Sequence, residues 1–199
     1  MKPAQEFQVV RPGVCFWQNY EPAVKCDLTS TAIQVGQGLI FIDPIPLASD
    51  ALDELIALAV PKLIVLTNGN HARAAAMMKE RFSIPIAAHP EAAANLGLFI
   101  DLELREGVDA AQGFEVVELP GAGAGEIALL ADGALLIGDA LIHLEPDGLR
   151  ILPDKYCLDA KTLRLALEKL LRFEWQLLTF AHGLPLVSNA RRKLESLLA

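Results

Sequence analysis

The stretch from residue 66 to residue 73, L-T-N-G-N-H-A-R, holds the densest group of side chains that could do chemistry. It offers the amides of Asn68 and Asn70, the imidazole of His71 and the guanidinium of Arg73, directly after the apolar run K-L-I-V-L. An imidazole titrates near neutral pH and can carry a proton, whereas a guanidinium keeps its charge and can hold an anion. The stretch is therefore part of an active site, part of a former active site that is now inactive, or an ordinary turn in which His71 bonds to backbone.

Two more chemical side chains follow apolar runs elsewhere in the chain. Asp139 comes after L-L-I-G, and His182 stands in F-A-H-G after another apolar run. Ligand sites of α/β sheets lie where strands end, so both groups are candidates for a common site. Taken singly, each could equally be a strand-end residue that bonds to nearby backbone.

The glycines Gly121, Gly123 and Gly125 are spaced like part of a dinucleotide-binding motif, but the rest of that motif is not matched. Glu126 stands where the last glycine is needed, and a hairpin rather than a long helix follows. We therefore interpret the cluster as a flexible turn.

The elements that must position these residues alternate between strand-like and helix-like patterns in both halves of the chain. A helix is expected to begin at a cap formed by Ser49 and Asp50, and Ser188 is expected to cap the last helix. Asp132-Gly133 predicts a type I′ hairpin. The expected strands are 14–17, 31–35, 39–43, 63–66, 84–88, 114–119, 126–131, 134–137 and 176–180, and further helices are expected at 72–82 and 159–172. This order predicts parallel pairing with helical crossovers and two facing sheets with helices outside, a four-layer αββα sandwich.

Composition limits the possible partners of this chain. Its 199 residues suit one domain, 1–199, and the net charge of −8 argues against nucleic acid. The basic run at 191–193 is expected on a solvated helix face toward the helix C-terminus. No apolar stretch is long enough for a membrane span, and the N-terminus lacks the apolar core of a signal peptide. Three scattered cysteines indicate free thiols in a reducing cytoplasm.

The hydrophobic fraction of 53% makes a homodimer plausible. The apolar segment 96–104 could be a lid over a pocket or a dimer contact, and the sequence leaves both open.

Together these motifs resemble the metallo-β-lactamase superfamily, whose fold is an αββα sandwich. The resemblance runs from about residue 11 to residue 198. Its landmarks are I-D-P-I near Asp43, L-T-N-G-N-H-A-R, L-P-G-A-G-A-G-E, L-L-I-G-D-A and F-A-H-G, in that order.

This chain differs from the metallo-β-lactamase superfamily at the positions of the metal ligands. The family signature Thr-His-x-His-x-Asp-His, laid on residues 67 to 73, places Asn68, Asn70, Ala72 and Arg73 at ligand positions. The histidine expected after the proline-glycine pair is Ala122, so only Asp139 and His182 match. Catalytic zinc needs about three imidazole, carboxylate or thiolate ligands, so a dinuclear centre is not expected. A single zinc, iron or manganese ion on His71, Asp139 and His182 stays open.

Two functions follow from this comparison. The first is a degenerate hydrolase-like protein that binds a small ligand, anionic or neutral, near Asn68, Asn70 and Arg73, with Arg73 paired to Asp139. The second is an active mononuclear or metal-free hydrolase of an ester, thioester or lactam that uses His71, Asp139 and His182. No serine or cysteine stands next to a base in the sequence, which favours the first function.

Overall fold

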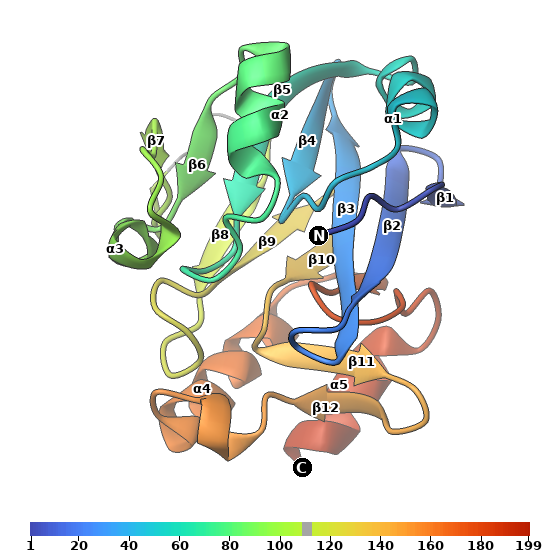
Figure 1. The fold of residues 1–199 in the computed structure, drawn as a ribbon. Helices are drawn as coiled ribbons and strands as arrows, with labels where there is room; N and C mark the ends of the chain where they lie inside the picture. The colour runs from blue at the N-terminus through green and yellow to red at the C-terminus, as the bar shows by residue number, and fades with distance from the viewer. Residues whose placement is uncertain (109–112) are drawn as a thin grey trace.

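The computed structural model describes residues 1–108 and 113–199, and it arranges them in layers with two facing sheets between helices (Figure 1). The first sheet follows chain order from β1 to β7. Its described strands are β1 (Gln8–Arg11), β2 (Val14–Glu21), β3 (Cys26–Val35), β4 (Gly38–Ile42), β5 (Val60–Leu66), β6 (Ile86–Ala88) and β7 (Leu102–Glu103).

The second sheet has the order β13-β10-β9-β8, and a two-stranded sheet, β11-β12, lies beside it. These strands are β8 (Glu115–Glu118), β9 (Ile127–Ala131), β10 (Ala134–Ile137), β11 (Leu141–Leu144), β12 (Gly148–Ile151) and β13 (Leu177–Thr179). The α-helices are α1 (Ser49–Ile56), α2 (Ala75–Phe82), α3 (Ala93–Leu96), α4 (Ala160–Glu168) and α5 (Ala190–Leu198). Short 3₁₀ turns occupy η1 (Pro90–Ala92), η2 (Asp154–Tyr156) and η3 (Lys169–Arg172).

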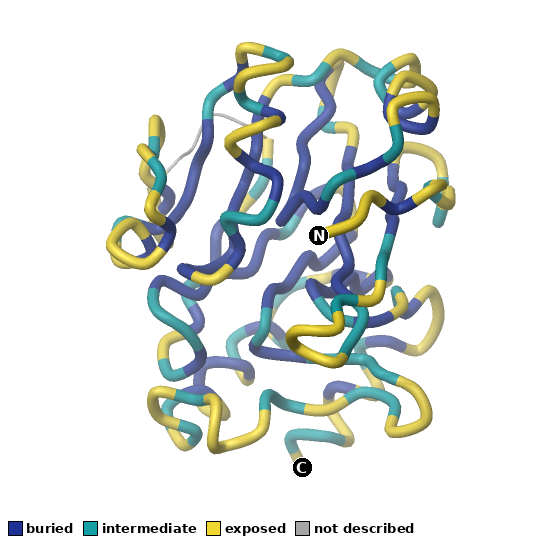
Figure 2. The backbone as a smooth tube through the Cα atoms, viewed as in Figure 1, coloured by how far each residue is buried: buried dark blue, intermediate teal, exposed yellow. Residues whose placement is uncertain are grey.

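Side-chain alternation explains why the layers stack in this way. Successive residues of a strand point to opposite faces, so a strand that is apolar throughout can bury both faces. Ile40 and Ile42 of β4 join a core shared with Leu129 of β9, between the sheets, whereas Phe41 packs toward α1 and α2. A third core lies between the second sheet and α4 and α5. The inner strands, among them β4, β5, β9 and β10, accordingly appear mainly as buried chain in Figure 2.

The main features expected from the sequence are confirmed. The fold is the four-layer αββα sandwich, and β4, β5 and β6 pair in parallel. The hairpin of β9 and β10 turns through Asp132 and Gly133, whose φ values of 46° and 69° are both left-handed.

Both predicted helix caps are wrong. Ser49 is already the first residue of α1, and no side chain caps that end. Asn189 rather than Ser188 precedes α5, again without a side-chain cap. Residues 191–193 therefore lie in the first turn of α5, where the helix dipole disfavours cations, and not near its C-terminus. Arg191 offsets this by donating to the carbonyls of Phe173 and Leu171.

The apolar segment 96–104 lies along the edge of the first sheet, where β7 pairs with β6. Leu96 and Leu104 are buried, whereas Phe99 is 78% exposed. Among the residues described, no helix is long and apolar enough to cross a membrane.

Candidate active site

The polar side chains of the candidate site come from four chain segments that follow strands of the two sheets. Asp43 follows β4, Asn68 and His71 follow β5, Asp139 follows β10, and His182 follows β13. The turn after β4 and the turn that leads to α2 each need an unusual backbone, because Asp43 (φ 47°) and Arg73 (φ 33°) adopt left-handed conformations. Such conformations cost energy in residues other than glycine and collect at functional sites.

His71 is buried and is held on both ring nitrogens. Its Nδ1 lies 2.9 Å from Oδ2 of Asp43 and 3.1 Å from the hydroxyl of Thr67. Its Nε2 lies 3.1 Å from Oδ1 of Asp139. Burial and the Arg73 charge would lower the pKa of His71, but Asp43 and Asp139 outweigh them and raise it to about 9.

Asp139 joins the two histidines. Its Oδ1 also lies 3.1 Å from Nε2 of His182, whose Nδ1 donates to the carbonyl of Asp27 at 3.1 Å. Burial would raise the pKa of Asp139, but the charges and hydrogen bonds of His71 and His182 hold it well below its ordinary value. One ring nitrogen of each histidine and a carboxylate oxygen of Asp139 all lie within 4.8 Å of one another.

Asn68 connects this cluster to a buried acid. Its amide nitrogen donates to Oε2 of Glu126 at 2.7 Å and to Oδ2 of Asp139 at 3.1 Å. Glu126 also accepts the backbone N–H of Ala140 at 2.9 Å. Burial and the nearby charge of Asp139 raise the pKa of Glu126 to about 8. Asn68 therefore bridges two carboxyl groups with different affinities for a proton.

Arg73 does not form the expected ion pair with Asp139, although the structure describes both residues. Its guanidinium donates to the backbone carbonyls of Thr29 (2.9 Å), Asp43 (3.2 Å) and Ala181 (3.4 Å). These carbonyls belong to β3, to the turn after β4 and to the loop after β13. Arg73 thus ties the site loops together, and Asp139 finds its partners in the two histidines and Asn68.

Among the solved structures that match this arrangement of elements, three are matched over nearly their whole length as follows. DIM-1 metallo-beta-lactamase has a TM-score of 0.76 at 14% identity, with 98% of this chain and 97% of that chain covered. A metallo-beta-lactamase from Pontibacter korlensis has a TM-score of 0.73 at 17% identity, with coverage of 97% and 98%. FIM-1 from Pseudomonas aeruginosa in its mono-zinc form has a TM-score of 0.71 at 17% identity, with coverage of 100% and 94%. At these identities the likeness shows the fold.

A sequence model of the metallo-beta-lactamase superfamily matches residues 7–199. This chain belongs to the metallo-beta-lactamase superfamily. No curated protein matches it in sequence.

The side chains do not fit the superfamily's dinuclear centre. Asn68 turns its amide nitrogen, a donor, toward the carboxylates, and its oxygen accepts the backbone N–H of Asn70. Asn70 is exposed, and Ala72 and Ala122 have no donor atoms. A first metal position would therefore lack ligands.

One cation fits better. His71 lies outside the superfamily's ligand positions. One of its ring nitrogens nevertheless lies close to Asp139 and His182, so two imidazoles and one carboxylate could share a cation. The Nδ1 atoms of His71 and His182 are held by the carboxylate of Asp43 and the carbonyl of Asp27, so that each Nε2 faces the site. An acceptor on the far nitrogen is the usual way in which proteins orient a histidine ligand.

Three residues of this site were not predicted from the sequence. Asp43 could have been found, because it follows an apolar strand just as Asp139 does. Nothing near Glu126 or Cys26 in the sequence signals a partner 58 or 156 positions away. In the fold, Sγ of Cys26 lies 3.4 Å from Nδ1 of His182, a contact that the sequence did not indicate.

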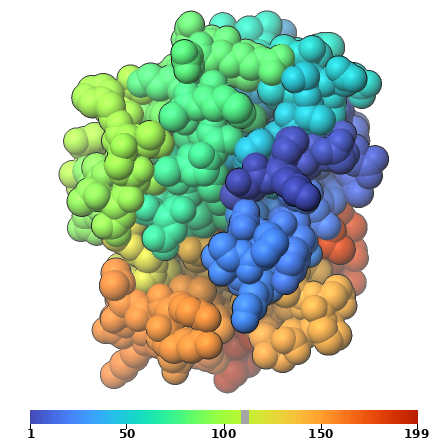
Figure 3. Space-filling view, in the orientation of Figure 1, coloured from blue at the N-terminus to red at the C-terminus, as the bar shows by residue number. Residues whose placement is uncertain are grey.

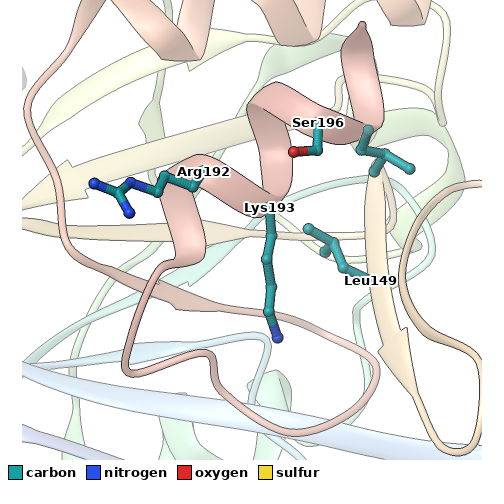
Figure 4. Close-up of a pocket in the computed structure, with 5 residues that line it drawn as sticks. Leu149, Arg192, Lys193 and Ser196 are labelled. Carbon is teal, nitrogen blue, oxygen red and sulfur yellow. The ribbon is translucent and has the colours of Figure 1, made fainter.

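One surface hollow lies away from the histidine cluster. A depression of about 440 Å³ lies between α5 and β12 and is lined by Leu149, Arg192, Lys193, Ser196 and Leu197. Arg192 and Lys193 point in different directions from α5 (Figure 4), and no residue of the histidine cluster lines this hollow.

Proposed function

We propose that this chain is a metallo-beta-lactamase-fold hydrolase that acts on the carbonyl group of an ester, thioester or lactam. His71, Asp139 and His182 form its reaction centre. The convergence of their donor atoms within 4.8 Å carries the proposal. Such a cluster between strand ends is where sheets of this kind place their chemistry.

A single divalent cation, zinc, iron or manganese, would be held by Nε2 of His71, Oδ1 of Asp139 and Nε2 of His182. A cation of this type supplies a Lewis acid and makes bound water more acidic. The residues of the chain do the positioning: Asp43 and the Asp27 carbonyl hold the two rings, and Asn68 holds the second oxygen of Asp139.

The alternative, a non-catalytic protein that binds a small anion near Arg73, has less support. Three backbone carbonyls already accept the guanidinium hydrogen bonds of Arg73. An anion at Arg73 would have to compete with these contacts. Of the two asparagines expected to help bind it, Asn70 is exposed and Asn68 is buried. The hydrolase is therefore the better explanation of the geometry.

The test is a measurement of bound metal and of turnover on protein purified without chelator. We expect about one ion per chain, and hydrolysis of a p-nitrophenyl ester, an acetyl thioester or a chromogenic lactam. His182→Gln should remove the ion and lower kcat/KM at least about a hundredfold. His89→Gln is the matched control, because His89 pairs with Glu118 outside the cluster.

A protein without metal that turns over none of the three substrates would overturn the proposal. Unchanged turnover in His182→Gln would do the same. A cytoplasmic location, a single domain and a homodimer remain predictions from the sequence, and light scattering after gel filtration tests the dimer.

A further inference from the structure

Glu126 is a buried acid beside the reaction centre that has no role in the proposed function. It is 3% exposed and directly precedes β9. Its Oε2 accepts the amide of Asn68 at 2.7 Å, and its Oε1 accepts the backbone N–H of Ala140 at 2.9 Å. Burying a carboxyl group costs free energy unless hydrogen bonds compensate it, so these two donors account for its place in the fold.

The backbone fixes the position at which Glu126 meets Asn68. Two hydrogen bonds, of 2.8 and 3.0 Å, join the residues on either side of Asn68 to the chain around Glu126. They run from the N–H of Ile127 to the carbonyl of Thr67 and from the N–H of Gly69 to the carbonyl of Ala124. The fold therefore presents the Glu126 carboxyl to the Asn68 amide whether or not a ligand is bound.

Glu126 also surrounds Asp139 along the chain. A Cβ added at Gly138 would lie 2.7 Å from Oε1 of Glu126, and the same oxygen accepts the N–H of Ala140. Glu126 thus packs against the residues before and after Asp139. Through Asn68, whose amide nitrogen also donates to Oδ2 of Asp139 at 3.1 Å, it reaches the carboxylate itself.

The direction of the Asn68 amide depends on these acceptors. Its oxygen accepts the N–H of Asn70 at 2.8 Å, and its nitrogen donates to the two carboxyl groups. A glutamine at position 126 could still accept the N–H of Ala140, but its own NH₂ would then face the NH₂ of Asn68. Two donors cannot bond to each other, so the Asn68 amide would have to move and Asp139 would lose its partner at Oδ2.

We propose that Glu126 is a positioning residue of the hydrolase, which holds Asp139 in place by orienting Asn68. Its effect on turnover rests on the proposed function, whereas the contacts it makes are present without a cation or a substrate. Oδ1 of Asp139 faces the two histidines, so a fixed Oδ2 sets the direction in which Oδ1 points. Hydrogen bonds to a ligating carboxylate orient it in this way.

The surroundings of Glu126 supply a matched control. Glu126 lines a cavity of about 320 Å³ together with Glu118. Figure 3 shows the yellow part of the chain, which contains the turn before Glu126, between the green part above it and the orange part below it, and the cavity takes lining residues from all three. Glu118 accepts from Nε2 of His89 and from the N–H of Glu106, both at 3.2 Å. Glu118→Gln therefore makes the same chemical change in the same cavity without touching Asn68.

The first experiment measures zinc affinity and hydrolysis of a p-nitrophenyl ester by the full chain. Glu126→Gln should lower zinc affinity and kcat about 10- to 100-fold, with little change in KM. Glu118→Gln should keep both within about twofold of the wild type. In an Asn68→Ala background, adding Glu126→Gln should cost less than about threefold, because no amide remains to be oriented.

The second experiment needs no metal and no substrate. In ¹⁵N–¹H spectra of the metal-free protein, the side-chain amide of Asn68 should exchange with solvent at least about tenfold more slowly than that of Asn95, which is exposed. Glu126→Gln should shift the Asn68 amide resonances and remove this protection, and Glu118→Gln should do neither. The wild-type comparison needs no variant to fold.

The outcomes separate this inference from the proposed function. Equal losses in Glu126→Gln and Glu118→Gln, no loss in Glu126→Gln, or the same loss with and without Asn68 would each overturn it. A wild type that binds no metal and turns over no substrate rejects the proposed function alone. The Asn68 resonances then decide: a shift in Glu126→Gln supports the inference, and unchanged resonances reject it. If Glu126→Gln does not fold, slow exchange of the Asn68 amide in the wild type supports the inference and fast exchange overturns it.

Discussion

Asp43→Asn replaces one buried carboxylate oxygen with an amide nitrogen. It tests whether Asp43 orients His71 to bind a cation. Asp43 is 1% exposed, and its Oδ2 lies 2.9 Å from Nδ1 of His71 while Oδ1 accepts the backbone N–H of Thr67 at 2.8 Å. An asparagine would keep the second bond and turn an N–H toward the ring. His71 must then accept at Nδ1 and hold its proton on Nε2, where a metal needs a lone pair.

The expected loss follows from this reversal. Changing the group that orients a histidine ligand lowers metal affinity about 10- to 100-fold. The variant also loses a charge-assisted hydrogen bond, which contributes about 1.5–3 kcal/mol to the free energy of unfolding. That is a visible part of the roughly 5–15 kcal/mol by which most domains are stable.

Zinc affinity is measured by competition with a chromophoric chelator, and stability by urea unfolding in EDTA. Asp53→Asn is the control, because Asp53 forms an exposed pair with Arg81 that contributes about 1 kcal/mol or less. If Asp43→Asn folds and binds zinc as tightly as the wild type, the orienting role assigned to Asp43 is wrong.

Two further predictions concern stability. The pKa of His71 is raised from 6.5 to about 9, so its stabilising effect is complete below pH 6.5 and is lost as the pH rises through 9. Urea unfolding of the metal-free protein at pH 6 and pH 10 should differ by about 3 kcal/mol more in the wild type than in His71→Gln, and equal differences would contradict the charge assigned to this ring. Gly138→Ala would place a Cβ 2.2 Å from the Thr67 hydroxyl, so we expect a loss of about 1–3 kcal/mol, whereas Gly123→Ala, whose Cβ would meet nothing closer than 3.7 Å, should change thermal unfolding little; equal effects would contradict this.

The layered fold could be predicted because its signals are local. Alternation of apolar residues located the strands, and Asp132-Gly133 located a hairpin that the structure confirms. The cap residues were wrong because Ser49 and Ser188 stand one residue away from the positions that need them. A helix boundary depends on how neighbouring loops pack, and sequence patterns locate it only to within a few residues.

The pairings inside the site could not be predicted in the same way. The sequence located His71, Asp139 and His182 at strand ends, and the structure brings all three together. It could not show that Arg73 turns toward backbone carbonyls, because that depends on a left-handed φ at a non-glycine residue. The partner of Cys26 is likewise set by how β3 meets the loop after β13.

The charges of the site explain how the fold persists without the superfamily's usual ligands. Asp43 and Asp139 are ionised, because nearby positive groups hold the pKa of each below its ordinary value. A buried carboxylate is costly without a partner, and His71 and Arg73 supply two positive charges for the two negative ones. A cation on Nε2 of His71 would have to displace the proton that balances Asp139, so proton and metal compete for the same nitrogen. Under the proposed function, the side chains of the chain organise this site, and a single ion on Nε2 of His71 would take the place of a proton.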